Sequence, residues 1–124
     1  MAKLFLILGS LNAMLAVILG AFGAHGLRGR LSEAMLNVYQ TGVQYHFYHA
    51  LGLIMVGMIA WHLPGSTWLK WSGGMMFAGI VIFSGSLYLL SLTQLRWLGM
   101  ITPLGGLAFI LSWLLLAAAV FNSR

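Results

Sequence analysis

Four long stretches of the sequence carry almost no charged residue, and this feature constrains the fold more than any other. The first stretch, Leu4 to Ala24, contains no charged residue at all. At 1.5 Å per residue, about 21 helical residues cover roughly the 30 Å of a bilayer's hydrocarbon core. Because three further apolar stretches follow, the chain is predicted to cross a membrane four times.

The composition supports this prediction and excludes several classes of protein. Hydrophobic residues make up 61% of the 124 residues and charged residues only 6%, whereas soluble domains carry about 25% charged residues. The formal net charge of +5 comes from six cations scattered among apolar runs, which form no basic stripe for nucleic acid. Without cysteine, the chain has no thiolate for catalysis, an iron–sulfur cluster or a zinc site. We therefore expect the lipid bilayer, and no nucleic acid, as a partner.

The predicted fold is an all-α membrane protein, a single domain over residues 1–124 with four transmembrane helices in an antiparallel bundle. The expected membrane helices cover residues 4–24, 45–62, 69–92 and 98–121. Four crossings place both termini on one side of the membrane. Basic residues do not decide which side, because three lie on each face and the positive-inside rule is tied.

An amphipathic interfacial helix is expected over residues 32–44, between the first and second membrane helices. From Leu31 onward, apolar residues recur at helical spacing while polar residues such as Glu33 and Asn37 occupy the other side. Ser32 is the predicted N-cap of this helix. Gly42 is the expected bend at which the chain turns into the bilayer.

Small residues four positions apart, Ala16, Gly20 and Ala24, form a row on the first predicted helix. Such a row lets a second helix approach closely. A packing groove within the monomer is the favoured interpretation, and an interface in a homo-oligomer is the alternative.

Polar residues that sit in or near the apolar stretches form the candidate site. Three of the four histidines lie between Gly20 and Leu53, together with the only acidic residue, Glu33. The candidate site comprises His25, Gln40, Gln44, Tyr45, His46, His49, Ser84 and Tyr88. If the first two membrane helices are antiparallel neighbours, His25 could meet His49, while His46 and His49 share a helix face.

Three interpretations of the histidines remain open. In the first, the histidines hydrogen-bond carbonyls, serines or lipid headgroups. In the second, two of His25, His46 and His49 are ligands of a metal or haem. In the third, the histidines transfer protons or contact a solute. No carboxylate is close in sequence to orient a metal-bound imidazole, and we expect no metal and no cofactor. The sequence also shows no set of nucleophile, base and acid, so an enzyme is not expected.

Four sequence motifs carry a family resemblance over nearly the whole chain. In chain order they are GAFGAHGL at 20–27, YQTGVQYHFYHALGL at 39–53, FSGSLYLLSLT at 83–93 and ITPLGGLAFILSW at 101–113. Together they resemble the domain of unknown function 423 family, small bacterial inner-membrane proteins that are similar to the transmembrane protein 256 family. The resemblance implies four membrane helices, cytoplasmic termini and no established activity.

These observations favour a small scaffold or accessory protein of the inner membrane that acts through helix contacts. The absence of a catalytic set and the rows of small residues motivate this hypothesis. Passage of a small solute or a proton through an oligomer is the alternative, motivated by the polar residues gathered at one membrane face. A metal or haem site ligated by histidine is the second alternative.

Overall fold

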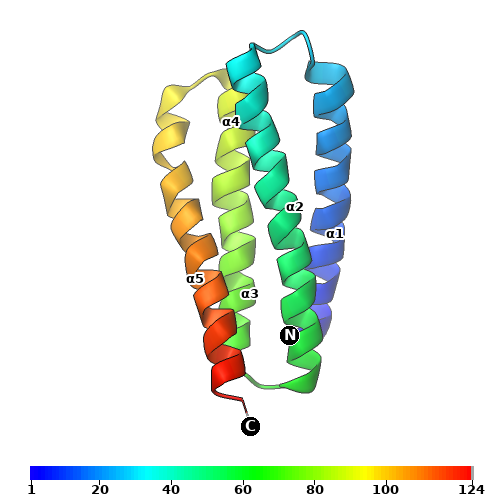
Figure 1. The fold of residues 1–124 in the computed structure, drawn as a ribbon, viewed down its shortest axis with the longest axis vertical. Helices are drawn as coiled ribbons and strands as arrows, with labels where there is room; N and C mark the ends of the chain where they lie inside the picture. Colours follow the sequence, from blue (N-terminus) through cyan, green and yellow to red (C-terminus); the bar gives the residue numbers. More distant parts are fainter. Residues whose placement is uncertain (124) are drawn as a thin grey trace.

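The computed structural model describes residues 1–123, which form four long helical rods joined by short loops (Figure 1). The described residues contain no strand. The first rod is α1 (Ala2–Phe22) extended by a π-helical turn, η1 (Gly23–Leu27), and the second is α2 (Glu33–His62). The third rod is α3 (Thr67–Gly79), a π-helical turn η2 (Ile80–Ser84) and α4 (Gly85–Thr93), and the fourth is a 3₁₀ turn η3 (Arg96–Met100) and α5 (Thr102–Phe121).

Each of the four rods is long and apolar enough to cross a membrane, which confirms the four predicted membrane helices. The rods contain 26, 30, 27 and 26 residues. At 1.5 Å per residue they measure about 39 to 45 Å, the thickness of a bilayer together with its headgroups. The rods are longer than predicted because helical hydrogen bonding continues beyond the ends of the apolar stretches. Exposed tryptophans at residues 61, 68 and 71 mark one membrane face.

The prediction of a separate interfacial helix over residues 32–44 is wrong. This segment is the first part of α2, which runs without a break from Glu33 to His62, and Gly42 does not interrupt it. Two contacts keep this segment packed along the other rods. Tyr39 is buried against Gly23 of the first rod, and Ser84 Oγ of the third rod donates a 2.7 Å hydrogen bond to the Gly42 carbonyl. Ser32 is the N-cap, as predicted, and its Oγ accepts from the backbone N–H of Met35 at 3.1 Å.

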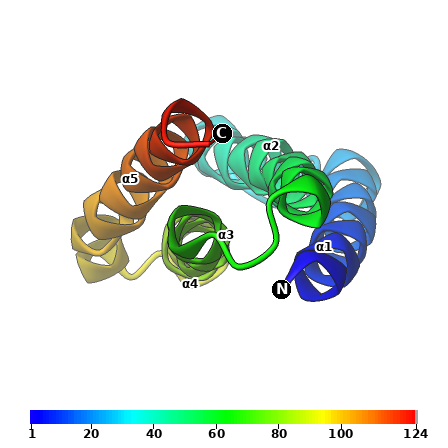
Figure 2. The ribbon, with the colours of Figure 1, turned by 90° about the horizontal axis from the view of Figure 1, so that it is seen from below.

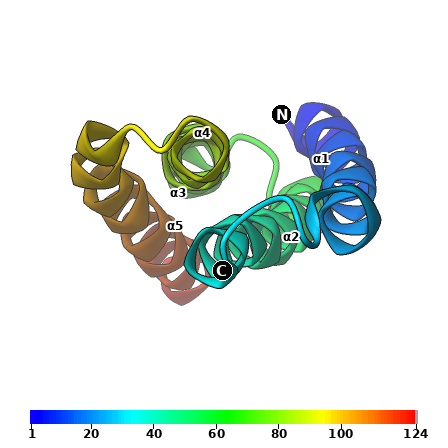
Figure 3. The ribbon, with the colours of Figure 1, turned by 90° about the horizontal axis from the view of Figure 1, so that it is seen from above.

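The four rods form an antiparallel but open arrangement. The second and third rods are the central pair, α1 packs mainly on α2, and α5 packs mainly on the third rod. Viewed from either end, α1 and α5 lie at opposite ends of a bent row (Figures 2 and 3). Both termini lie at the same end of the molecule (Figure 1). A hollow lies on each flank of the central pair, one between α1 and the third rod and one between α2 and α5.

Glycines and alanines bring α1 and α2 into close contact. A Cβ atom at Gly9 would lie 2.8 Å from the Ala50 carbonyl oxygen, and one at Gly57 would lie 3.0 Å from the Ala2 carbonyl oxygen. Ala16 is 1% exposed, and a Cβ at Gly20 would contact Val43 on α2. Most of the predicted small-residue row therefore serves packing within the monomer, as favoured from the sequence.

Candidate functional site

The polar residues singled out from the sequence do not form one site. The structure divides them into a buried cluster around His46, an aromatic groove beside His49 and an outward-facing stripe on α2. His25 belongs to none of these. The three places differ in how many of their polar groups are left without a hydrogen-bond partner.

His46 lies at the centre of a hydrogen-bonded chain that joins α1, α2 and α4. Its Nε2 is 2.9 Å from Asn12 Oδ1, and its Nδ1 is 2.8 Å from the phenol oxygen of Tyr88. Asn12 Nδ2 donates to the Leu8 carbonyl at 2.8 Å, so the amide oxygen of Asn12 must accept. This pattern assigns the His46 proton to Nε2 and makes Nδ1 the acceptor of the Tyr88 hydroxyl. A neutral His46 thus has both ring nitrogens engaged.

The rest of the buried cluster is equally well paired. The Tyr39 hydroxyl donates to the Leu19 carbonyl on α1, and the ring centroids of Tyr39 and Tyr88 are 5.4 Å apart. Ser84 is fully buried and bonds to Gly42. In the part of the chain that the structure describes, no buried side-chain nitrogen or oxygen lacks a partner. The cluster therefore stabilises the packing of the membrane helices through interhelical hydrogen bonds.

His49 connects α2 to α5. Its Nδ1 lies 2.8 Å from the Tyr45 carbonyl and donates to it, and its Nε2 accepts from Trp113 Nε1 at 2.9 Å. The imidazole stacks on Phe109 with ring centroids 3.5 Å apart and an interplanar angle of 8°. His49 is thus also neutral, and both its nitrogens are used.

The predicted meeting of His25 with His49 is wrong. Asn12 lies beside His46, and Gly23 lies beside Tyr39. His25 follows Gly23 in the chain, so it lies near the level of Tyr39, which is ten residues or about 15 Å along α2 from His49. The prediction failed because α2 begins at residue 33 rather than 45, which carries His49 far below the membrane face. Among residues 1–123, no group of three or more His, Cys, Asp or Glu side chains is placed to hold a metal ion.

A groove of about 530 Å³ separates α2 from α5. The upper end of α5 diverges from α2 (Figure 3), and Phe83 at the η2 turn forms part of the groove's floor. Tyr45 and Tyr48 are 38% and 49% exposed and lie on the α2 side. The groove is lined by Tyr45, Tyr48, His49, Phe83, Gly106, Phe109, Ile110 and Trp113.

The stripe on the outer side of α2, which we call the α2 stripe, consists of Glu33, Asn37, Gln40 and Gln44. All four side chains are exposed. They recur at spacings of three and four residues, so they share one helix face. Gln44 Nε2 donates to the Tyr48 hydroxyl oxygen at 2.7 Å, which connects the stripe to the rim of the groove.

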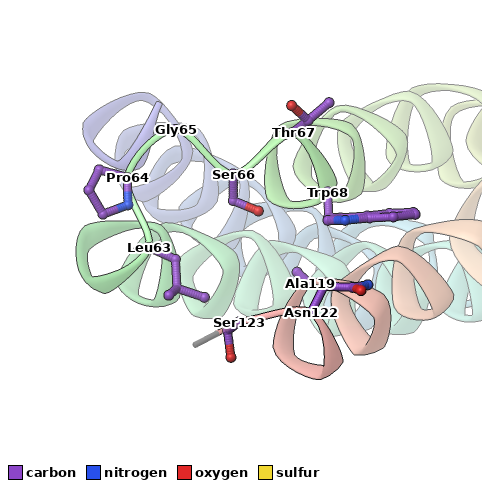
Figure 4. Close-up of a pocket in the computed structure, with 9 residues that line it drawn as sticks. All are labelled: Leu63, Pro64, Gly65, Ser66, Thr67, Trp68, Ala119, Asn122 and Ser123. Atoms are coloured by element: carbon purple, nitrogen blue, oxygen red, sulfur yellow. The ribbon is translucent and has the colours of Figure 1, made fainter.

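Another hollow of about 410 Å³ lies at the terminal end of the molecule, between the loop that follows α2 and the end of α5 (Figure 4). Its polar side chains are engaged in local helix ends. Ser66 Oγ caps the Leu69 N–H, and Asn122 Nδ2 donates to the Ala118 carbonyl. We find no converging set of polar groups in this hollow.

Sequence reasoning missed three residues that shape these sites. Asn12 is the His46 partner, Trp113 is the His49 partner and Phe109 stacks on His49. A lone asparagine in an apolar helix and a tryptophan far from either membrane face were the available signals. Both depart from the pattern of an ordinary lipid-facing helix.

Comparisons with known proteins agree with the fold. A family model described as "Protein of unknown function (DUF423)" matches residues 19–106. The UPF0382 membrane protein YwdK of Bacillus subtilis is 59% identical over 117 residues, which cover 94% of this chain and 95% of the relative. The UPF0382 membrane protein SH2409 of Staphylococcus haemolyticus is 52% identical over 122 residues, and SAB0533 of Staphylococcus aureus is 51% identical over 122 residues, each with 97% of both chains covered. No solved structure matches the chain.

Proposed function

The chain belongs to the DUF423 family of membrane proteins, and from its structure we propose that it is a small scaffold that acts through helix contacts, first of all with a second copy of itself. The observation that carries this proposal is the α2 stripe. The amides of Gln40 and Gln44 face outward from the monomer at a depth where lipid chains are expected.

The depth of the stripe follows from the length of α2. The 30 residues of α2 measure about 45 Å, and the hydrocarbon core accounts for about 30 Å of that length. With the excess shared between both ends, Gln40 lies about 3 Å inside the upper boundary of the core and Gln44 about 9 Å inside it. Polar residues at such depth almost always face protein or a water-filled cavity.

The exposed amides differ from the exposed hydroxyls of the same molecule. Ser10 and Thr41 donate to the carbonyls of Leu6 and Asn37 in their own helices, so lipid can surround them at little cost. Among the described residues, no group hydrogen-bonds to the side-chain amide of Gln40. An amide that faces hydrocarbon without partners is costly. Amides that pair across helices stabilise helix association by about 0.6 to 2 kcal/mol each.

A second copy is the natural partner for this stripe. In a two-fold symmetric dimer the same surface is present on both subunits, and glutamine amides both donate and accept, so they can pair with themselves. The only charged residue of the stripe is Glu33, which lies at its solvent end. Repulsion between like charges therefore does not prevent Gln40 and Gln44 from pairing with a second copy.

The test is the mass of the protein in a mild detergent, measured by light scattering after size exclusion over a range of concentrations. We expect a dimer for the wild type and at least a tenfold weaker dimer for the double variant Gln40→Leu, Gln44→Leu. Ser10→Leu, at an exposed polar position on α1, is the matched control and leaves the dimer unchanged. A wild type that stays monomeric, or a double variant that dimerises normally, contradicts the proposal.

We also propose that the protein lies in the bacterial inner membrane with both termini in the cytoplasm. The bacterial relatives and the position of both termini at one end of the molecule support this placement. Solute passage and a metal or haem site at His46 or His49 gain no support from the geometry, because both imidazoles use both nitrogens in protein hydrogen bonds.

A further inference from the structure

We propose that the groove between α2 and α5 binds a flat, ring-bearing apolar molecule that carries a carbonyl acceptor, the chemistry of a membrane quinone. The groove adjoins the α2 stripe through the hydrogen bond from Gln44 to Tyr48, but the inference does not depend on self-association.

The size and lining of the groove favour such a ligand. Sites for small molecules typically have volumes of about 300 to 1,000 Å³ and aromatic walls with a few polar groups, and this groove measures about 530 Å³. Six of its eight lining residues carry a ring. Aromatic faces and edges attract other flat rings beyond the effect of buried area alone.

Two phenol groups supply the polar contacts. Within the described residues, the Tyr45 hydroxyl has no hydrogen-bond partner, and the Tyr48 oxygen accepts from Gln44 while its own O–H remains available. Their rings meet edge to face with centroids 5.7 Å apart. Since water is scarce at this depth, a ligand that brings a carbonyl oxygen relieves the cost of two unpaired donors.

The other polar groups of the groove need nothing from a ligand. Trp113 donates to His49, and His49 donates to the Tyr45 carbonyl. A charged ligand would therefore find no counter-charge in the groove, whose eight lining residues include no charged side chain. This argues for a neutral molecule with one or two acceptors.

Two other occupants fit less well. A saturated lipid chain has neither a flat face nor an acceptor at this level. A helix of a second copy is 10–12 Å across, and 530 Å³ corresponds to roughly one 5.4 Å turn of such a helix. The groove is too short for a helix that packs along its length. The groove is lined by residues of α2, the η2 turn and α5, and these residues lie within the membrane-spanning parts of the rods. We therefore expect a ligand dissolved in the bilayer to enter from the lipid without crossing a headgroup layer.

The experiment uses the purified full chain in lipid nanodiscs, titrated with a decyl-substituted benzoquinone, with quenching of tryptophan fluorescence as the signal. Trp113 is the tryptophan in the groove, so the difference between wild type and Trp113→Phe isolates its contribution. We expect saturable quenching of Trp113. We expect at least tenfold weaker binding in Tyr45→Phe, Tyr48→Phe, which keeps both rings and loses both donors. Far-ultraviolet circular dichroism confirms that each variant is folded.

Controls separate the possible outcomes. Decanol, which has the chain without the ring, must not compete, and Ser10→Ala, on α1 and outside the groove, must bind as the wild type does. Quenching that rises linearly with the quinone in the lipid, or that is equal in the tyrosine double variant, overturns the proposal. Equal competition by decanol assigns the groove to lipid chains instead and also overturns it. Each of these results can arise with either a monomer or a dimer, so failure here differs from failure of the self-association.

Discussion

Replacing Tyr88 with phenylalanine removes one oxygen atom and leaves the aromatic ring in place. That oxygen donates to His46 Nδ1 at 2.8 Å. His46 cannot compensate by moving its proton, because Nε2 must donate to an Asn12 oxygen whose amide nitrogen is committed to the Leu8 carbonyl. The variant therefore leaves a buried acceptor without a donor.

The expected loss of stability is about 1 to 2 kcal/mol. An unsatisfied buried acceptor in a soluble protein costs about 1–3 kcal/mol, and single hydrogen bonds between membrane helices have been worth about 0.6 kcal/mol on average and 1.7 at most. The packing of the ring against Tyr39 should survive the substitution. A loss of 1.4 kcal/mol corresponds to a tenfold change in the unfolding equilibrium constant.

The assay is reversible unfolding in mixed detergent micelles, followed by circular dichroism, on Tyr88→Phe, Asn12→Leu and the double variant. Once Asn12 is gone, His46 Nε2 has lost its acceptor and no longer strengthens the hydrogen bond from Tyr88 to Nδ1, so Tyr88→Phe should cost less in that background. The two losses are therefore not additive. Ser10→Ala, an exposed hydroxyl on α1, should change stability by less than about 0.5 kcal/mol. Full stability of Tyr88→Phe, or strict additivity, would refute the structural role assigned to His46.

Three further predictions address packing, metals and topology. Gly105→Ala should lower the free energy of unfolding by about 1–3 kcal/mol, because its Cβ would lie 2.4 Å from the Phe83 backbone nitrogen. Gly74→Ala, whose Cβ would have nothing within 4 Å, should raise the free energy of unfolding by about 0.5–1 kcal/mol. Equal effects of the two variants in the unfolding assay would contradict this packing. Zinc or a chelator should leave the unfolding midpoint unchanged, because His46 and His49 use both nitrogens; a zinc-dependent rise would reveal a ligand role. Reporter fusions at the two termini should give the same signal, and opposite signals would contradict four crossings.

The membrane spans could be predicted from the sequence because hydrocarbon imposes a strict length on uncharged helices. The Ser32 cap was predictable for a similar reason, since its hydroxyl acts on a backbone N–H three residues away. The polar pattern over residues 33–44 was ambiguous. A helix that lies at the interface and a membrane helix with one polar outer face give the same spacing, and burial of Tyr39 against the first rod decides between them.

The histidine partners could not be predicted, because they depend on the register between helices. Asn12 and His46 are 34 residues apart, and His49 and Trp113 are 64 residues apart. An error of twelve residues in the start of α2 was enough to place His25 beside the wrong histidine. No local signal indicated the π-helical turn η2, which nonetheless sets the position of Phe83 in the groove.

We infer that the buried polar side chains of the described residues are all hydrogen-bonded within the monomer and that the protein contacts a second copy through the α2 stripe. The most direct test is a single-cysteine scan along α2 in native membrane vesicles, which is clean because the chain has no cysteine of its own. We predict that oxidation yields disulfide-linked dimers at positions 37, 40 and 44 and little at positions 39 and 46, whose side chains are buried inside the monomer. Equal yields around the helix, or a maximum at α2 positions outside the stripe, would contradict this assignment of the contact surface.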